Sequence, residues 1–590
     1  MFSPAQLEVH LAEHELLSFI NEQDLASLET IHARDEELIA ELQDKNPDQE
    51  AHVPSATGLR FANAELAKLT QEEYSVAQLS RLEKFLGDKG TLNIPIVEGH
   101  KITVDGVEHD ILLVGATEQS ENGTNHGEMS SMFYLRDHIQ AARALMELNL
   151  RDPARYEQEG ILGKKLLISV LHCMATPKQL ERYRNVIELG TKASQEDWPH
   201  ISLWPDDLQG EKDNGWRNKQ DTFQMLTHLT LDALDRDFID VATLSQSHKQ
   251  FLGSAVPLLA AVGFPGYESS GSWEEVAARR TSVMAVETAL LHKIANHQGD
   301  KFDFLQEVYE NSRLIKDTGK GFDEQVSEML DAGLMEIGRR LPFESPDYAP
   351  GSVKYREGDA ALAYVLMYGL PQMLTAANIP IGKGASTMSA REIEDLVLSE
   401  LEKLFDPETN GVIRYKEDSY QRVNFHTNEV QLIVGAIKKR VKHDANKNHS
   451  EVDLDNKQVL RNELTPKGKE AAWTHSLGQL SEWATRRKLE EADGTEAAKH
   501  YKALGTMFAN LQMSTITGKN RWNAVLDKNG NYKLQPAAEF RLSECIVTYQ
   551  TSSGERFTVP SPHTPLNWSA ATLKLALGLL RVAASKEETS

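Results

Sequence analysis

The sequence predicts a mainly α-helical protein in which helical hairpins close into a toroid. Its 590 residues exceed one ordinary domain, and a hydrophobic fraction of 40% is enough for a sizeable core. From residue 131 onward, apolar residues recur at helical spacing in about a dozen runs that alternate with polar loops. No sequence repeat is visible, which argues against a stacked repeat protein.

Residues 1–125 are expected to form a small N-terminal region of helices with one β-hairpin. Residues 5–90 show helical spacing of apolar residues among many acidic ones. Between residues 91 and 114 the pattern changes to strict alternation around Asp105-Gly106, a dipeptide typical of two-residue hairpin turns.

Residues 126–590 are expected to form one helical barrel domain. A second hairpin is expected late in the chain, where strands over 522–527 and 531–534 flank Asn529-Gly530. The same stretch faintly resembles a calcium loop, but its glycine comes too early and no closing glutamate follows. The helical runs are expected at residues 133–149, 176–193, 219–234, 250–262, 274–297, 302–315, 321–340, 358–376, 390–405, 427–441, 465–490, 496–515 and 568–584.

The charge and the metal-binding residue types exclude several classes of protein. With 63 basic and 88 acidic residues the formal net charge is −25, which argues against nucleic acid or anionic membranes as main partners. Cys173 and Cys545 are the two cysteines, too few for a disulfide framework or a thiolate metal site. His10 and His14 would share a helix face, but no third ligand is apparent. We therefore expect neither a metal nor a cofactor.

The chain also lacks the sequence signals of export. Its first residues show no basic segment followed by a long apolar one, and no run of about 18 apolar residues exists. A cytoplasmic location without a membrane span is therefore expected.

Two adjacent carboxylates follow a tryptophan in the stretch Gly271-Ser272-Trp273-Glu274-Glu275. An apolar wall and a like-charged neighbour both raise a carboxyl pKa, as a general acid working near neutral pH requires. Glu274 is therefore a candidate general acid. The alternative is that both glutamates begin a helix, where acidic residues favour the positive end of the dipole. Taken alone, the pair fits this alternative better.

Two other stretches suit the recognition of hydroxyl groups. Arg136-Asp137 stands at the head of a helical run and offers donors and an acceptor to two neighbouring hydroxyls. The alternative is a helix cap with a surface ion pair. Trp216 lies five residues before Asp221, a spacing that suits stacking on a sugar face with hydroxyl recognition beside it. The alternative there is a capped helix start.

The last candidates lie in the C-terminal third. Residues 411–420 combine Arg414 with two tyrosines and a double acid, typical either of a polar site wall or of a strand edge with solvated charges. Glu544 lies among apolar residues, where an unpaired carboxylate is costly, so it is a better candidate than an ordinary surface glutamate. Trp568 follows an extended segment that leads into the last helical run.

Taken together, these stretches resemble glycoside hydrolase family 15, the glucoamylase family, whose (α/α)6 toroid also occurs in the α and β subunits of phosphorylase kinase. The matches follow the family's order from about residue 130 to about residue 585. Arg136-Asp137 is similar to the family's Arg-Asp, and residues 216–221 are similar to its Trp-Gly-Arg-Pro-Gln-x-Asp-Gly stretch. Trp273-Glu274-Glu275 resembles its Trp-Glu-Glu, and residues 414–418 resemble its Arg-Tyr-Pro-Glu-Asp. Ser543-Glu544 resembles its Ser-Glu, and residues 566–569 resemble its Leu-Thr-Trp-Ser.

The resemblance implies an (α/α)6 fold and an inverting, exo-acting hydrolase related to glucoamylase, glucodextranase or trehalase. Its partner would be an oligo- or polysaccharide with α-linked glucose, from whose non-reducing end glucose is released. It implies Glu274 as general acid and Glu544 as general base. The residues implied to bind or wall the sugar are Arg136, Asp137, Trp216, Asp221, Trp273, Glu275, Arg414 and Trp568.

Some positions depart from the family pattern. Gly271 stands where the family has an aspartate, and the gap from Glu544 to Trp568 is longer than in fungal members. Glu539 and Glu555 are therefore alternative bases. The alternative function is a non-catalytic carbohydrate-binding or regulatory protein like the phosphorylase kinase subunits.

Overall fold

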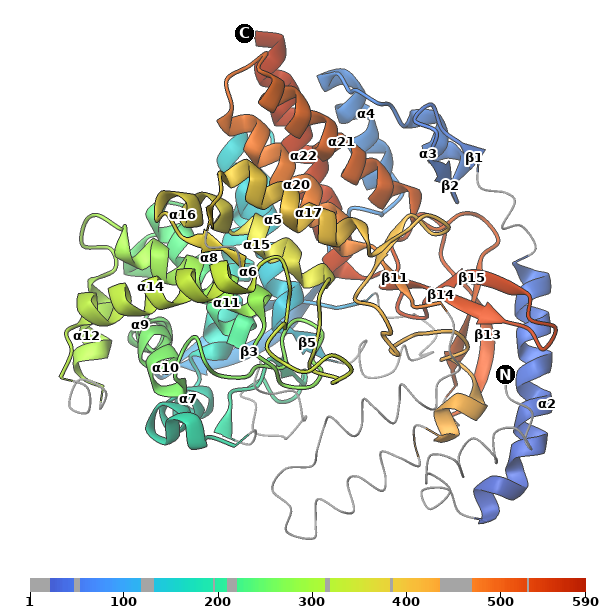
Figure 1. Cartoon of the computed structure of the whole chain (residues 1–590), viewed down its shortest axis with the longest axis horizontal. Coiled ribbons are helices and arrows are strands. Elements are labelled where there is room, and N and C mark those ends of the chain that lie inside the picture. The colour runs from blue at the N-terminus through green and yellow to red at the C-terminus, as the bar shows by residue number, and fades with distance from the viewer. Residues whose placement is uncertain are drawn as a thin grey trace.

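The protein is mainly α-helical, which confirms the predicted fold class (Figure 1). A computed structural model describes the chain over residues 22–46, 53–117, 132–194, 197–208, 220–312, 319–382, 386–433, 435, 469–527 and 530–589. Within these ranges no helix is both long and apolar enough to cross a membrane.

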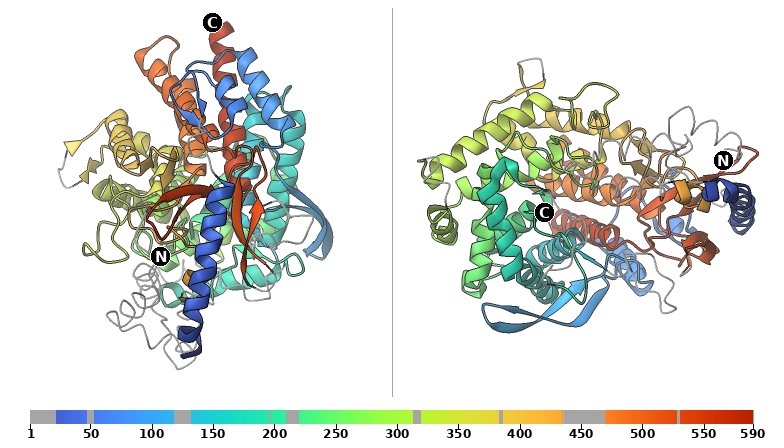
Figure 2. Two further views of the ribbon diagram at one scale, coloured as in Figure 1. Left: turned by 90° about the vertical axis from the view of Figure 1, so that its right-hand side faces the viewer. Right: turned by 90° about the horizontal axis from the view of Figure 1, so that it is seen from below.

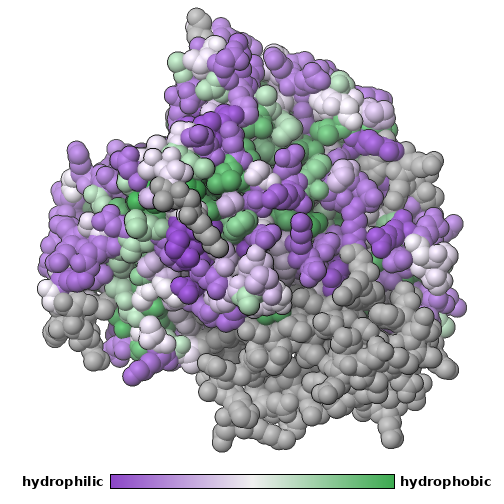
Figure 3. All heavy atoms as spheres, in the orientation of Figure 1, coloured by the Kyte–Doolittle hydropathy of each residue, from purple (hydrophilic) through white to green (hydrophobic). Residues whose placement is uncertain are grey.

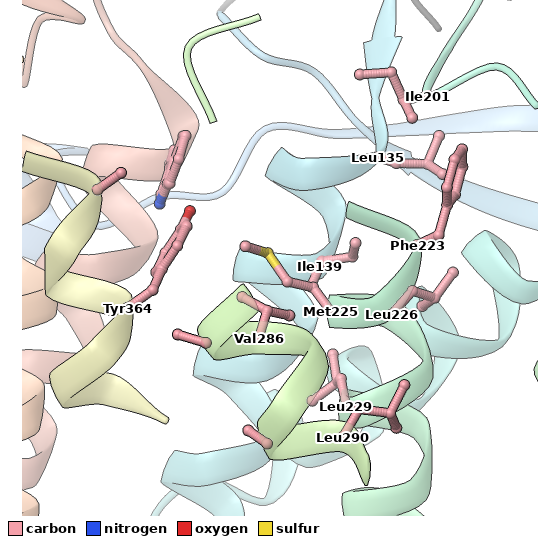
Figure 4. Packing of buried hydrophobic residues seen from close by; sticks show 14 of the residues in the cluster. Leu135, Ile139, Ile201, Phe223, Met225, Leu226, Leu229, Val286, Leu290 and Tyr364 are labelled. Carbon is pink, nitrogen blue, oxygen red and sulfur yellow. The ribbon is translucent and has the colours of Figure 1, made fainter. Parts of the chain in front are cut away.

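Six helices of the described chain form a closed ring. Each helix packs against the next, and the last packs against the first, so the predicted toroid is confirmed. In Figure 4 the apolar side chains of three consecutive members meet, as Ile139, Met225 and Val286 show. The ring consists of α5 (Leu135–Arg151), α8 (Gln220–Asp235), α11 (Thr281–Ala295), α15 (Ala363–Met367), α20 (His475–Glu490) and α22 (Asn567–Thr589).

A second layer of helices covers the ring from outside. Here α6 packs on α5, α14 on α11, α21 on α20 and α4 on α22, so the N-terminal region provides the outer partner of the last ring helix. The outer helices are α4 (Val76–Asp88), α6 (Glu157–Met174), α7 (Pro177–Leu189), α9 (Gln246–Gly253), α10 (Ala255–Val262), α12 (Asp303–Glu310), α14 (Phe322–Arg340), α16 (Leu370–Ala376), α17 (Ala390–Glu402) and α21 (Glu496–Ser514).

Local capping and breaking residues set several helix ends. The hydroxyl of Ser389 accepts from the backbone N–H of Glu392, whose carboxylate accepts in return, so α17 begins with a capping box. The run expected at 358–376 is instead divided into α15 and α16. Gly369 adopts φ +70° between the two helices, and Pro371 falls in the first turn of α16.

Other helical expectations also need correction. Helix α6 was not expected, because Gly163, Lys164 and Lys165 interrupt the apolar residues of 161–171, which show no clear period. The run expected to begin at 274 begins at Thr281, since residues 271–280 form turns and a bridge.

The sheets are small and antiparallel. The predicted hairpin is confirmed as β3 (Ile96–Val104) and β4 (Val107–Val114), with positive φ at Asp105 and Gly106. The late hairpin is confirmed as β12 (Trp522–Leu526) and β13 (Tyr532–Pro536). A five-stranded sheet in the order β15-β14-β11-β10-β9 was not expected, because three of its strands have only two or three residues. The strands of this sheet are β9 (Phe405–Asp406), β10 (Gly411–Ile413), β11 (Ala472–Trp473), β14 (Cys545–Gln550) and β15 (Arg556–Pro560). Three further strand pairs are β1 (Val53–Pro54) with β2 (Arg60–Phe61), β5 (Phe133–Tyr134) with β6 (Ser202–Leu203), and β7 (Pro380–Ile381) with β8 (Ser386–Thr387).

The N-terminal segments attach to the helical body at separate places. Helix α2 (Glu22–Lys45) lies beside β12 and β13 at one edge of the molecule (Figure 2). Helix α3 (Ala64–Leu69) and α4 share a hydrophobic core with α21 and α22. Because residues 118–131 lie outside the described ranges, the domain boundary at residue 125 stays a prediction. On the face shown in Figure 3, hydrophilic residues cover most of the described surface, and hydrophobic ones show in a central band.

Candidate active site

Four ring helices direct their N-terminal ends at one site. Arg136 and Asp137 are the second and third residues of α5, Asp221 is the second of α8, His475 the first of α20 and Trp568 the second of α22. A helix N-terminus carries a partial positive charge and favours nearby carboxylates. The ring therefore gathers residues that lie far apart in the sequence.

Glu274 lies in a tight turn and not in a helix. Its backbone N–H donates to the carbonyl of Gly271, and its φ is +57°, a conformation that is rare for residues with a side chain. Gly271 has φ +64°, and a Cβ there would lie 2.4 Å from Cδ of Arg280, which explains the glycine at this position. The alternative that Glu274 and Glu275 begin a helix is therefore wrong.

Arg136 connects Glu274 to the second ring helix. Its Nη1 lies 3.4 Å from Oε1 of Glu274, and its Nη2 donates to Oδ2 of Asp221 at 3.0 Å and to the hydroxyl of Thr222 at 3.1 Å. Burial alone would lower the pKa of Arg136, but the carboxylates of Asp221 and Glu274 raise it above its ordinary value. Asp221 is completely buried, so this carboxylate acts on a ligand indirectly, through its contacts with Arg136 and Ser272.

Glu275 is bound by three buried side chains. Its Oε1 accepts from Arg414 at 2.8 Å, and its Oε2 accepts from Arg356 at 2.5 Å and from the hydroxyl of Tyr415 at 2.6 Å. Arg414 in turn donates to both carboxylate oxygens of Asp418, at 2.5 and 2.6 Å. Glu275 is therefore the centre of a buried ion-pair network beside Glu274.

Aromatic side chains surround these charges. Nε1 of Trp273 donates to Asp359 at 2.6 Å, which fixes the indole next to Glu274. The Trp273 ring lies 5.6 Å from Trp473, and His475 lies 4.1 Å from Trp568. The guanidinium of Arg414 lies over the rings of Trp273 and Trp473, and that of Arg136 lies over Trp568.

Glu544 lies in the same site, just before β14. Burial, together with the charges of Asp137 and Glu274, raises the pKa of Glu544 to about 8, although the charge of Arg414 and a hydrogen bond oppose the shift. That hydrogen bond comes from Nε2 of Gln421, 2.9 Å from Oε2.

The alternative bases lie elsewhere. Glu555 is exposed at the turn between β14 and β15, and Glu539 is partly exposed beside Asn63. Of the three carboxylates, Glu544 is the buried one.

Several polar atoms at the site have no protein partner among the described residues. They include Oδ1 of Asp137, Nε1 of Trp568 and Nε1 of Trp473. Burial raises the pKa of Asp137 to about 7, against the opposing charge of Arg136 and a hydrogen bond from the backbone N–H of Trp568. Buried donors and acceptors without partners are rare in folded proteins, so these atoms are suited to bind a hydroxyl-bearing ligand.

The structure brings together nine of the ten predicted site residues; Trp216 lies outside the described ranges. Sequence reasoning missed Arg356, Asp359, Gln421, Trp473 and His475. Trp473 and His475 stand in the short sequence Ala-Trp-Thr-His, which leads into α20, and this aromatic pair was available as a signal. Arg356, Asp359 and Gln421 showed no signal in the sequence, because each forms its hydrogen bond with a site residue more than 80 positions away. No cluster of three or more potential metal-binding side chains occurs in the described part of the chain.

Solved structures with a similar course of the chain are glycosidases. A glucoamylase from Saccharomycopsis fibuligera is 12% identical, with coverage of 87% of this chain and 97% of that one and a TM-score of 0.46. A structure described as a glycosidase is 12% identical, with coverage of 88% and 98% and a TM-score of 0.41. A glucoamylase from Hormoconis resinae is 12% identical, with coverage of 86% and 73% and a TM-score of 0.40. At this identity the likeness describes the course of the helices and not their chemistry.

No protein-family model matches the sequence, and no curated protein matches it.

Proposed function

We propose that this chain is a glycoside hydrolase that uses Glu274 and Glu544 as a catalytic pair. The observation that carries the proposal is the electrostatic contact between two carboxyls in different environments. Glu274 is partly exposed and lies beside the Arg136 guanidinium, whereas Glu544 is buried, and this burial raises its pKa, with smaller contributions from the charges of Asp137 and Glu274. Two carboxyls at one site are the machinery of glycosidic bond cleavage.

The finer proposal is inverting, exo-acting hydrolysis of an α-glucoside with release of glucose from the non-reducing end. Glu274 gives its proton to the glycosidic oxygen as the bond to the anomeric carbon breaks. Glu544 takes a proton from a water whose oxygen attacks that carbon from the opposite face. The sequence resemblance supports this division of roles.

The remaining residues are proposed to bind the terminal sugar. Among the described residues, one oxygen of Asp137 and the indole N–H of Trp568 have no hydrogen-bond partner, so both are open to a sugar hydroxyl. Trp273 and Trp568 would form aromatic walls, since sugars present apolar faces to such rings. Asp221 and Glu275 would act indirectly, because they are bound to Arg136 and Arg414.

The testing experiment is reducing-sugar release from a panel of α-glucosides, including maltose, isomaltose and trehalose, by the wild type and by Glu274→Gln. We expect turnover of at least one by the wild type and loss of it in the variant. NMR of the first anomer should show β-glucose. Initial release of α-glucose would contradict inversion, and no release from any member would contradict hydrolysis.

A second candidate is carbohydrate binding without turnover. The raised pKa of Glu544 favours it, because a carboxyl with a pKa of about 8 is mostly protonated at neutral pH and cannot then act as a base. Sugar binding that is equal in the wild type and Glu274→Gln, with no reducing sugar formed, would decide for it.

A further inference from the structure

A cavity of about 500 Å³ lies in the ring at the end opposite to Glu274 and Glu544. Its walls come mostly from the C-terminal halves of α5, α8 and α20, together with His292 of α11 and residues of α15 and α16. Arg143 on α5 lines it, seven residues after Arg136 at the other site, which is about 10 Å along a helix. The cavity is therefore distinct from the proposed active site.

The cavity exists because one ring helix is short. Helix α15 has 5 residues, whereas α5 has 17, α8 has 16 and α20 has 16. Gly369 with φ +70° and Pro371 in the first turn of α16 end the inner helix early and turn the chain outward. The ring thus lacks one wall over the half that lies away from Glu274, and residues 366–369 form the edge of this gap.

The charged groups of the cavity are already neutralised by one another. Arg143 binds Glu482 with both guanidinium nitrogens, at 2.5 and 2.7 Å. Arg486 lies 2.8 Å from Glu482, and Asp232 pairs with Lys293 at 2.9 Å. A charged ligand would have to break one of these partly buried pairs, and the free energy lost would exceed the free energy of the new contact. The lining therefore favours a neutral ligand.

Unused hydrogen-bonding groups face the same space. The hydroxyl of Tyr368 and the ring of His228 line the cavity without a hydrogen-bond partner among the described residues, and their rings lie 5.1 Å apart at right angles. Nε of Arg486 is buried and has no partner in this part of the chain. Burial lowers the pKa of His228 to about 4, so the imidazole is neutral at pH 7 and offers one donor and one acceptor. Trp483 adds an indole to the wall.

We propose that this cavity is a second carbohydrate site, which binds a neutral sugar of mono- or disaccharide size at the end of the ring opposite to Glu274. A hydroxyl both donates and accepts, as the neutral imidazole, the phenol and the guanidinium require. The C–H face of a sugar ring suits the partly exposed ring of Tyr368, and Trp483 lies behind it as a buried part of the wall. The volume lies in the range of small-molecule sites. This proposal does not depend on turnover at the other site.

The test is 19F NMR of the full chain labelled with 5-fluorotryptophan, titrated with D-glucose and with maltose. The chain has eight tryptophans, and Trp483→Phe assigns the signal that reports on the cavity. Glu274→Gln serves as the background so that maltose persists. We expect a saturable shift of the Trp483 signal with either sugar. The signals of Trp273 and Trp568 report the other site separately.

Two variants and one control make the result specific. Tyr368→Phe removes one hydroxyl and is expected to weaken sugar binding at Trp483 about fivefold, the effect of one lost hydrogen bond between neutral groups. Ala376→Trp, at the exposed mouth of the cavity, is expected to abolish the shift without removing a polar group. Tyr355→Phe removes a hydroxyl outside the cavity and should leave the shift unchanged.

Three outcomes would overturn the proposal. One is a silent Trp483 signal while Trp273 and Trp568 respond, which would leave the proposed function intact. Another is a Trp483 shift produced equally by sodium sulfate, which would indicate an ion site. The third is unchanged sugar binding in both Tyr368→Phe and Ala376→Trp. A chain that hydrolyses no glucoside but shows the Trp483 shift would support this site while contradicting the function proposed above.

Discussion

The side-chain amide of Gln421 donates a hydrogen bond of 2.9 Å to Oε2 of Glu544. The orientation of this amide is fixed by His426, whose Nε2 hydrogen-bonds to Oε1 of Gln421. Burial lowers the pKa of His426 to about 3, so the ring is neutral and carries the proton on the nitrogen that faces Gln421. His426 and Gln421 therefore stabilise the ionised form of Glu544, against the burial that raises its pKa.

Replacement of Gln421 should move the pKa of Glu544 further upward. Gln421→Leu removes a hydrogen bond to a charged group, which corresponds to roughly one pKa unit. If Glu544 is the base, the rising part of the kcat/KM profile should move to higher pH by about that amount. Gln550→Leu, which changes a partly exposed amide outside the site, should leave the profile in place. An unmoved profile in Gln421→Leu would contradict the role given to this amide.

The pH dependence should identify which carboxyl is the base. Glu544 in the free chain loses its proton near pH 8, so a base role predicts that kcat/KM rises with pH up to about 8. The exchanged assignment, with Glu544 as acid, predicts a kcat/KM that falls above about pH 8. Initial rates on a neutral glucoside between pH 4 and 10 distinguish the two, and a profile flat between about pH 6 and 9 would contradict both.

Removal of either carboxyl should abolish most turnover while the fold is kept. Glu274→Gln and Glu544→Gln are each expected to lower kcat by about 10²- to 10⁴-fold, the usual contribution of a general acid or base. Glu268→Gln and Glu555→Gln are matched controls at exposed positions nearby in the sequence and should retain activity. Equal loss in a control, or full activity in Glu544→Gln, would move the catalytic role to another residue.

Asp221 should contribute strongly to the stability of the fold, although it is buried behind Arg136. Asp221→Asn leaves the buried Arg136 guanidinium without its strongest partner, and breaking such a pair costs about 3–5 kcal/mol of unfolding free energy. Asp235→Asn on the same helix breaks a more exposed pair and should cost less than about 1 kcal/mol. Urea denaturation measures both. Equal, small effects would show that Arg136 tolerates burial without Asp221.

The packing of two histidines should make the fold sensitive to acid. The Ser245 N–H donates to Nδ1 of His248, so Nε2 of His248 carries the proton and donates to Nδ1 of His172 at 3.0 Å. Burial lowers the pKa of His172 to about 3 and that of His248 to about 4, below their unfolded value of 6.5. The unfolded chain therefore binds more protons, and stability is lost as the pH falls from about 6.5 to about 3.

His172→Leu should remove part of this loss. The difference in unfolding free energy between wild type and variant is expected to change by up to about 1.4 kcal/mol per pH unit across that window. Denaturation series at pH 7, 6, 5 and 4 measure it. His292→Leu, at a histidine whose pKa burial also lowers, should show a smaller dependence on pH. A difference that does not vary with pH would mean that His172 is protonated in the folded chain.

The parts of the structure that depend on near neighbours were accessible from the sequence. The turn at Asp105-Gly106 and the helices that begin at Ala390 and Glu496 follow from residues within a few positions of one another. The errors fall where local patterns are ambiguous. The apolar residues of helix α6 are interrupted by Lys164 and Lys165 and show no clear period, and the acidic pair at Glu274 is compatible with either a helix start or a turn.

Periodicity and adjacency are local properties, so the helical character of the chain and the grouping of Trp273, Glu274 and Glu275 can be read from the sequence. The contacts of these residues depend on how the chain folds. Glu275 meets Arg414 across 139 positions, and Gln421 meets Glu544 across 123. Such partners are selected by the closure of the helical ring, which no local pattern encodes. The same closure, with one short helix, leaves the cavity beside Tyr368.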